Sequence, residues 1–259
     1  MDKNIMLAAA EDPTVLETGL SRRDALRRSG LLGAGLAAMT LPAALTAVSG
    51  TAFAQTSGAT RIVNALNIAY LLERLEAEFY QLGLARAGLI PASDRAIFTQ
   101  ISKHEDAHVR YLAAALGSNV ARIPAFDFTA GGQFDTFTNY QTFLLLAQGF
   151  EDFGVRAYKG QAGNLVSNKA VLTAALSIHG VEARHASRIR RLRGSKGWIT
   201  GGAPPAPALA AVYAGEGNTM QLGIDTAKYA GADAATEAFD EPVTDVFAVY
   251  AVAKLFFRA

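Results

Sequence analysis

Residues 105–108 read E-D-A-H. It is a Glu-x-x-His pattern, and residues i and i+3 lie on one face of an α-helix. Ser93-Asp94 is a candidate helix cap ahead of it, and Gly117 is a candidate stop after it. The pattern therefore predicts a helix that presents Glu105 and His108 on the same side.

The chain repeats this pattern once, as E-A-R-H at residues 182–185. Glu73 precedes Glu105 by 32 residues, and Glu151 precedes Glu182 by 31. Matched separations of this kind indicate a duplicated helix hairpin in which each half contributes half of one site.

The two earlier glutamates share a further feature. Glu73 is followed seven residues later by Tyr80, and Glu151 seven residues later by Tyr158. Seven residues are nearly two helical turns, so each tyrosine lies on the same face as its glutamate. Tyr80 and Tyr158 are therefore candidate hydrogen-bond donors to carboxylates across the bundle; the equal alternative is an ordinary half-buried tyrosine.

Apolar residues recur at helical spacing through four segments, and short loops join the first to the second and the third to the fourth. Short loops make neighbouring helices antiparallel, whereas the Gly- and Phe-rich connection 117–135 is long enough for a crossover. We predict an all-α four-helix bundle with one long crossover, from helix 2 to helix 3. The expected helices cover 61–87, 93–116, 136–162 and 167–193.

The remaining chain is predicted to be a loop and a C-terminal helical extension that packs on the bundle. Residues 194–208 are a loop by composition, and pieces of helix are expected around 209–230. Asp240-Glu241-Pro242 is expected to open a last apolar helix that runs through Phe257. No convincing alternating strand pattern is present.

This order of Glu, Glu-x-x-His, Glu, Glu-x-x-His resembles the ferritin-like superfamily. Residues 64–90 are most similar to exported ferritin-like domain proteins, a group that includes plant desiccation-related proteins. The resemblance implies a dinuclear iron or manganese carboxylate site, with Glu105 and Glu182 as bridging ligands. It implies that the full ligand set is Glu73, Glu105, His108, Glu151, Glu182 and His185.

The residue types suit that chemistry. Two divalent cations bring four positive charges, which four glutamates balance, and two neutral imidazoles complete the ligand set. Without metal, four carboxylates in a bundle core would cost several kcal/mol per ion unless they were protonated. Glu76, one turn after Glu73, is the alternative ligand on the first helix. We prefer Glu73 because it matches Glu151 in both of its spacings.

Other charged residues of these helices are expected to lie at the surface. Neither His104 nor His179 follows a glutamate by three residues, and we interpret both as capping or surface residues, with a hydrogen bond to a metal ligand as the alternative. The arginines that end the fourth helix, from Arg184 to Arg193, suit the helix dipole and are expected to form a solvated end.

The N-terminal residues 1–54 are interpreted as an export signal. Arg22-Arg23 precedes an uncharged, apolar stretch that closes with Ala52-Phe53-Ala54, an A-x-A cleavage pattern. The arginine pair resembles the twin-arginine signal of bacteria. We therefore expect export by the twin-arginine machinery to the periplasm and a mature chain of 55–259, with the bundle in 55–193 and the extension in 194–259. An uncleaved signal acting as a membrane tether is the alternative.

Composition excludes several other functions. The 259 residues include no cysteine, which excludes thiolate zinc sites, iron–sulfur clusters and catalytic thiols. Lys+Arg 24 against Asp+Glu 23 leaves a net charge of +1, which argues against nucleic-acid binding. The sequence leaves open a homo-oligomer.

Two functions follow from these expectations. The first is a redox enzyme in which two iron or two manganese ions act on O2 or peroxide, as an oxidase, ferroxidase or catalase. A reductase would need an external electron donor, because no cysteine is present for a fused iron centre. The second is a non-catalytic stress- or desiccation-related protein whose bundle is structural or sequesters metal.

Overall fold

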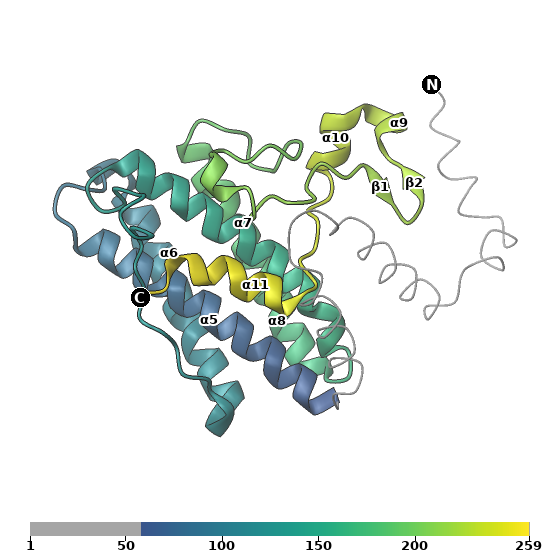
Figure 1. The fold of residues 1–259 in the computed structure, drawn as a ribbon, viewed down its shortest axis with the longest axis horizontal. Coiled ribbons are helices and arrows are strands. Elements are labelled where there is room, and N and C mark those ends of the chain that lie inside the picture. Colours follow the sequence, from purple (N-terminus) through teal and green to yellow (C-terminus); the bar gives the residue numbers. More distant parts are fainter. Residues whose placement is uncertain (1–57, 259) are drawn as a thin grey trace, which may run out of the picture. The chain divides into compact units, whose positions relative to one another are not determined.

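The computed structural model describes residues 58–258, and four long helices dominate this part of the chain (Figure 1). Helix α5 packs against α6 and α7, and α7 packs against α8. The predicted all-α bundle is confirmed. Its helices are α5 (Gly58–Ala85), α6 (Ala92–Leu116), α7 (Tyr140–Leu165) and α8 (Lys169–Leu192).

Hydrogen bonds between α5 and α7 give the direction of the helices. Tyr80 on α5 contacts Glu151 on α7, and Tyr158 on α7 contacts Glu73 on α5, so these two helices are antiparallel. Short turns at 86–91 and 166–168 reverse the chain after α5 and after α7. Helices α6 and α7 are therefore parallel, and residues 117–139 form the long crossover between them.

The helix boundaries differ from the expected ones at α6. The residue that precedes its first turn is Pro91, and no side chain caps the helix. The predicted Ser93-Asp94 cap is wrong, because both residues already lie inside the first turn. The Asp94 carboxylate instead accepts a hydrogen bond of 2.7 Å from the Tyr140 hydroxyl, which ties the start of α6 to the start of α7. Gly117, with φ of 55°, ends the helix as expected.

Helix α7 begins later and ends later than expected. Asn139 caps it by accepting hydrogen bonds from the backbone amides of Gln141 and Thr142, as asparagine does at many helix starts. The predicted break at Gly163-Asn164 is wrong, because the helix continues to Leu165. Leu165 is buried against Ala175 and Ile178 of α8, and this packing outweighs the weak helix propensity of glycine.

The C-terminal part contains short elements. The last helix, α11 (Val246–Ala253), begins after Asp245, which caps it, and not at Asp240 as predicted. Residues 220–225, where no strand was expected, form a two-stranded hairpin. The remaining elements are η1 (Gly117–Asn119), η2 (Pro207–Leu209), β1 (Met220–Gln221), β2 (Ile224–Asp225), α9 (Ala227–Ala230), α10 (Ala232–Glu237) and η3 (Lys254–Phe256).

A buried arginine on α7 holds part of this C-terminal chain against the bundle. The Arg156 guanidinium donates hydrogen bonds to the backbone carbonyls of Val212, Ala214 and Glu241 and pairs with Glu216. Helix α11 packs on α5. The extension therefore covers the α5–α7 side of the bundle through both polar and apolar contacts.

The core divides along the helices into apolar clusters. The largest contains the aromatic rings of Phe79, Phe98 and Phe143, and the Phe79 and Phe143 rings stack with centroids 4.6 Å apart. Smaller clusters form around Ala65 and around Leu66, nearer the start of α5. Glu73 lies on α5 between these two levels, so the polar cluster described below is enclosed by apolar packing.

No helix in the described range is both long and apolar enough to cross a bilayer. The predicted signal and the alternative of a membrane tether concern residues 1–54, which lie outside the described residues.

A glycine substitution tests how the extension is held. A Cβ added at Gly160 on α7 would lie 2.0 Å from the carbonyl oxygen of Val243, whereas a Cβ at Gly163 would meet nothing within 4 Å. We expect Gly160→Ala to destabilise the protein by about 1–3 kcal/mol through displacement of the extension. Gly163→Ala, the matched control, should be neutral or stabilising by up to about 1 kcal/mol. Chemical unfolding measures both; equal stability of the two variants would contradict this packing.

Candidate metal centre

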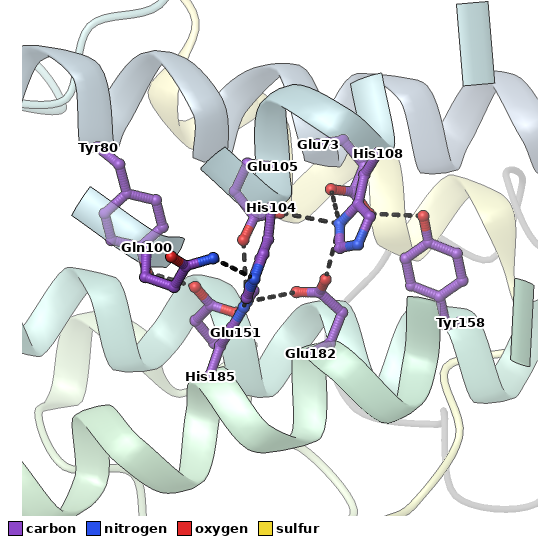
Figure 2. A network of polar contacts seen from close by, with 10 residues as sticks. All are labelled: Glu73, Tyr80, Gln100, His104, Glu105, His108, Glu151, Tyr158, Glu182 and His185. Carbon is purple, nitrogen blue, oxygen red and sulfur yellow. Dashed lines mark hydrogen bonds and ion pairs between the residues drawn. The ribbon is translucent and has the colours of Figure 1, made fainter. Parts of the chain in front are cut away.

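Each of the four bundle helices contributes one fully buried glutamate. The side chains are Glu73 from α5, Glu105 from α6, Glu151 from α7 and Glu182 from α8, all with an exposed fraction of 0%. All four positions lie in the middle of a long helix, and the antiparallel pairing brings them to one level of the bundle. The four glutamates predicted from the sequence are therefore brought together (Figure 2).

Two histidines point into this carboxylate cluster through the same ring atom. The Nδ1 atom of His108 lies 3.1 Å from Glu73, 3.2 Å from Glu105 and 3.2 Å from Glu182. The Nδ1 atom of His185 lies 2.9 Å from Glu105 and 3.2 Å from Glu151. Each Glu-x-x-His pair thus presents both side chains on one helical face, as its spacing predicts.

The six side chains form two overlapping groups that could each hold an ion. Within each group, the ligand atoms all lie within 4.8 Å of one another. Glu105 and Glu182 belong to both groups, which agrees with their expected position between two ions. The first group is Glu73, Glu105, His108 and Glu182, and the second is Glu105, Glu151, Glu182 and His185.

The two tyrosines donate hydrogen bonds to the other two glutamates across the bundle. The Tyr158 hydroxyl lies 2.6 Å from Glu73 Oε1, and the Tyr80 hydroxyl donates to Glu151 Oε1. Burial first, and then the adjacent carboxylate, raises the pKa of each tyrosine, so both remain donors. Each hydrogen bond fixes one carboxylate oxygen, Oε1 of Glu73 or Oε1 of Glu151.

Glu76 is also buried, with an exposed fraction of 2%, but it belongs to neither group of ligand atoms. It faces Gly154 on α7: a Cβ there would lie 3.4 Å from Glu76 Oε1 and 3.5 Å from Glu182 Oε2. Burial, and then the charges of Glu182 and Glu151, raise the pKa of Glu76 well above its usual value. A protonated Glu76 adds no charge to the cluster.

Burial and mutual repulsion shape the ionisation of the cluster. Desolvation raises the pKa of Glu105 and Glu182 well above the usual value and that of Glu151 to about 8. For His108, burial alone would lower the pKa, but contacts with Glu182 and Glu73 outweigh it and raise the pKa to about 10. The metal-free cluster is therefore stabilised by retained protons, as expected for carboxylates packed without counter-ions.

The expectation that His104 is a capping or surface residue is wrong. Its Nδ1 atom lies 2.9 Å from Nε2 of His185, and the two rings stack with centroids 5.1 Å apart. The sequence contained a signal for this contact, because His104 precedes His108 by one helical turn and therefore lies on the same side of the helix. His179 is half-buried on α8, and its Nδ1 atom has no hydrogen-bond partner in the structure.

The expectation of a solvated end to α8 is confirmed for Arg184, Arg188 and Arg191, which are exposed, and is wrong for Arg190. Arg190 is buried and pairs with both carboxylate oxygens of Asp152, the residue after Glu151. Tyr213 from the extension donates a further hydrogen bond to Asp152. Sequence periodicity could not reveal this pair, because the chain that covers Arg190 comes from outside the bundle.

The donor set fits hard or borderline divalent ions. Glu105 Oε1 and both oxygens of Glu182 are buried and accept no hydrogen bond of good geometry, although Nδ1 of His185 lies 2.9 Å from Glu105 Oε1 and Nδ1 of His108 lies 3.2 Å from Glu182 Oε1. Buried carboxylate oxygens without well-aligned donors carry a desolvation penalty, which bound cations would offset. Four carboxylates and two imidazoles match the preference of iron and manganese for oxygen and nitrogen ligands. The residues present therefore fit bound metal ions of this class.

Comparison with models of known families agrees with the fold. Residues 62–195 match the family model described as a ferritin-like domain, a stretch that includes all six of these candidate ligands and both tyrosines. No curated protein matches the chain. The matched stretch covers more than half of the sequence, and the chain belongs to the ferritin-like domain family.

Proposed function

We propose that the buried glutamates and histidines hold two iron or two manganese ions and that the loaded centre acts on O2 or peroxide. The observation that carries this proposal is the pair of overlapping ligand groups that share Glu105 and Glu182. An arrangement with two shared carboxylates favours two ions over one, because each shared side chain has an oxygen for each ion.

The charge balance supports the same proposal. Two divalent ions would neutralise the four ligand carboxylates, and burial, which raises the pKa of Glu76, disfavours a further negative charge beside them. The chain has no cysteine, so the ligands available at this level are oxygen and nitrogen donors.

Such a pair of ions would supply the electrons that are exchanged with O2 or peroxide. The protein positions the ligands: Tyr80 and Tyr158 orient Glu151 and Glu73, and the aromatic cluster beside the site limits the access of water. The chain carries no built-in thiolate iron centre, which favours oxidase, ferroxidase or catalase chemistry over a reductase. A reductase would need an external electron donor as a partner.

A non-catalytic role is the second candidate, and the depth of the site favours it. The four ligand glutamates have no exposed surface, and the side chains of His108 and His185 are only 12% and 6% exposed. In this alternative the bundle sequesters metal, or is structural, in a stress- or desiccation-related protein. The resemblance to desiccation-related proteins that we infer from residues 64–90 is the ground for this alternative.

The N-terminal sequence supports a proposal for the location of the protein. We propose that the twin-arginine machinery exports the chain to the periplasm and that the signal 1–54 is removed. The arginine pair and the A-x-A pattern support this proposal. The tether formed by an uncleaved signal remains its alternative.

Loading the protein with metal separates the two functions. Protein recovered from the periplasm should contain close to two metal ions per chain by elemental analysis. Anaerobic loading with Fe(II) or Mn(II), followed by O2 or peroxide, should give repeated turnover if the centre is catalytic. Bound metal without turnover for either metal would favour sequestration, and less than about a tenth of an ion per chain would contradict the metal centre.

Matched variants of the two glutamates on α5 test the ligand assignment. Glu73→Gln removes a ligand charge, and we expect it to weaken binding of at least one ion by about 10-fold or more. Glu76→Gln is nearly isosteric with the protonated side chain and should retain both ions. Metal titration by calorimetry measures this difference. The reverse result would make Glu76 the ligand on α5.

The pH dependence of stability tests the ionisation of the metal-free cluster. The folded state holds the proton of Glu151 up to about pH 8, whereas the unfolded chain releases it near 4.5. The stability contributed by this proton is therefore fully present below pH 4.5 and is lost as the pH rises to about 8. The pKa of His108 is raised from 6.5 to about 10, so the stability contributed by its charged form is lost as the pH rises from 6.5 to about 10. This loss has the same sign as that of Glu151.

We expect the melting temperature of the metal-free protein to fall by several degrees between about pH 5 and pH 8. Glu151→Gln should have a shallower dependence because it has no proton to lose. Thermal unfolding in the presence of a chelator gives both curves. Parallel curves for the variant and the unchanged protein would show that Glu151 does not titrate in this range.

A further inference from the structure

A chain of hydrogen bonds leads from the exposed side of α6 to the cluster. The exposed Gln100 places its Nε2 atom 2.7 Å from Nε2 of His104, and Nδ1 of His104 lies 2.9 Å from Nε2 of His185. The other ring nitrogen of His185 faces Glu105 and Glu151. Figure 2 shows these three side chains in series, with His104 between Gln100 and His185.

The second half of the duplicated helix hairpin does not repeat this series of hydrogen bonds. His104 directly precedes Glu105, and the corresponding residue before Glu182 is Val181, which cannot form the same contact. Only the half of the site around His185 therefore has this link to the surface of α6 within the described residues.

The donor and acceptor of each hydrogen bond in this series follow once the donor at the Gln100 end is known. An amide nitrogen can only donate, so Nε2 of His104 accepts from Gln100 and the proton of a neutral His104 ring lies on Nδ1. That N–H donates to Nε2 of His185, and the proton of His185 then lies on Nδ1, where it faces carboxylates. In the metal-free arrangement all three groups donate toward the cluster.

A metal ion on His185 requires the opposite order. The ion takes the lone pair of Nδ1, so the ring proton must lie on Nε2 and must be donated outward. Nδ1 of His104 then accepts, its proton lies on Nε2, and that N–H needs an acceptor. Gln100 provides one if its amide turns so that Oε1 replaces Nε2.

We propose that His104 and Gln100 are positioning residues that set the tautomer of His185, and that metal binding reverses the direction of the two hydrogen bonds that join Gln100, His104 and His185. The inference rests on the proposed metal centre. The protons balance: His185 loses the proton of Nδ1 and gains one at Nε2 from His104, and His104 takes one from water at its outer nitrogen. Each ring keeps one proton, and one proton leaves from the cluster.

The reversal has a structural consequence. Occupancy of a site buried inside the bundle changes the orientation of an amide on the exposed side of α6. The ion held by His185 also depends on an acceptor at position 104, whereas the ion held by His108 does not. The two metal positions should therefore differ in their response to substitutions at His104.

Nitrogen-15 NMR of the histidine rings tests the reversal directly. Zn(II) alone serves as the probe, because it is divalent, diamagnetic and bound by the same oxygen and nitrogen ligands. In the metal-free protein the proton of His104 should be on Nδ1. After Zn(II) is added, the protons of both His104 and His185 should be on Nε2, and the Gln100 amide resonances should shift.

Variants add an affinity measurement. His104→Leu leaves the outward N–H of His185 without an acceptor, and we expect one of two Zn(II) ions to bind about 10–100-fold more weakly. His104→Asn, which keeps an acceptor near the position of Nδ1, should recover much of this loss. His179→Leu removes the other non-ligand histidine and should leave both affinities unchanged.

The outcomes separate this inference from the metal centre. Failure of the protein to bind Zn(II) would overturn both. Binding of two ions with unchanged tautomers of His104, or with full affinity in His104→Leu, would overturn the inference and leave the metal centre intact.

Discussion

The structure depends on four carboxylates that share one level of a bundle interior. Glu73, Glu105, Glu151 and Glu182 have no exposed surface, and a buried charge is stable only when it is neutralised. Protons retained by Glu105, Glu151 and Glu182, whose pKa values burial raises, contribute to this neutralisation in the metal-free protein, and the two divalent cations of the proposed centre would provide it in the loaded one. The free energy of folding and the affinity for metal are therefore coupled through the same four side chains.

The rest of the bundle holds these carboxylates in place. The antiparallel pairing of α5 with α7 lets each tyrosine reach the glutamate of the opposite helix, as Tyr80 does with Glu151. Stacked phenylalanines such as Phe79 and Phe143 fix the helices at the adjacent level. Arg156 and Arg190 bind chain from beyond the bundle against α7 and α8. Apolar packing and buried ion pairs thus give the cluster its rigid surroundings.

The sequence was most informative where residues repeat and least informative where distant chain covers the bundle. Helical spacing alone placed Glu105 with His108 and Glu182 with His185, because both members of a pair lie on one helix. It failed for Arg190, whose environment is completed by Trp198 from a loop. Helix ends such as the start of α6 were misplaced, because the structure shows Asp94 bonded to another helix and not to its own first turn.

The two halves of the site are equal in their ligands but not in their surroundings. Glu76 follows Glu73 by one turn, whereas the matching position after Glu151 is Gly154, and the glycine leaves the space beside Glu76 Oε1 open. His104 has no counterpart on α8. A duplicated hairpin thus supplies symmetric candidate ligands, while single residues give the two ligand groups different surroundings. The group around His185 is joined through His104 to the exposed Gln100, so the two groups differ in their hydrogen-bonded connection to the surface of α6.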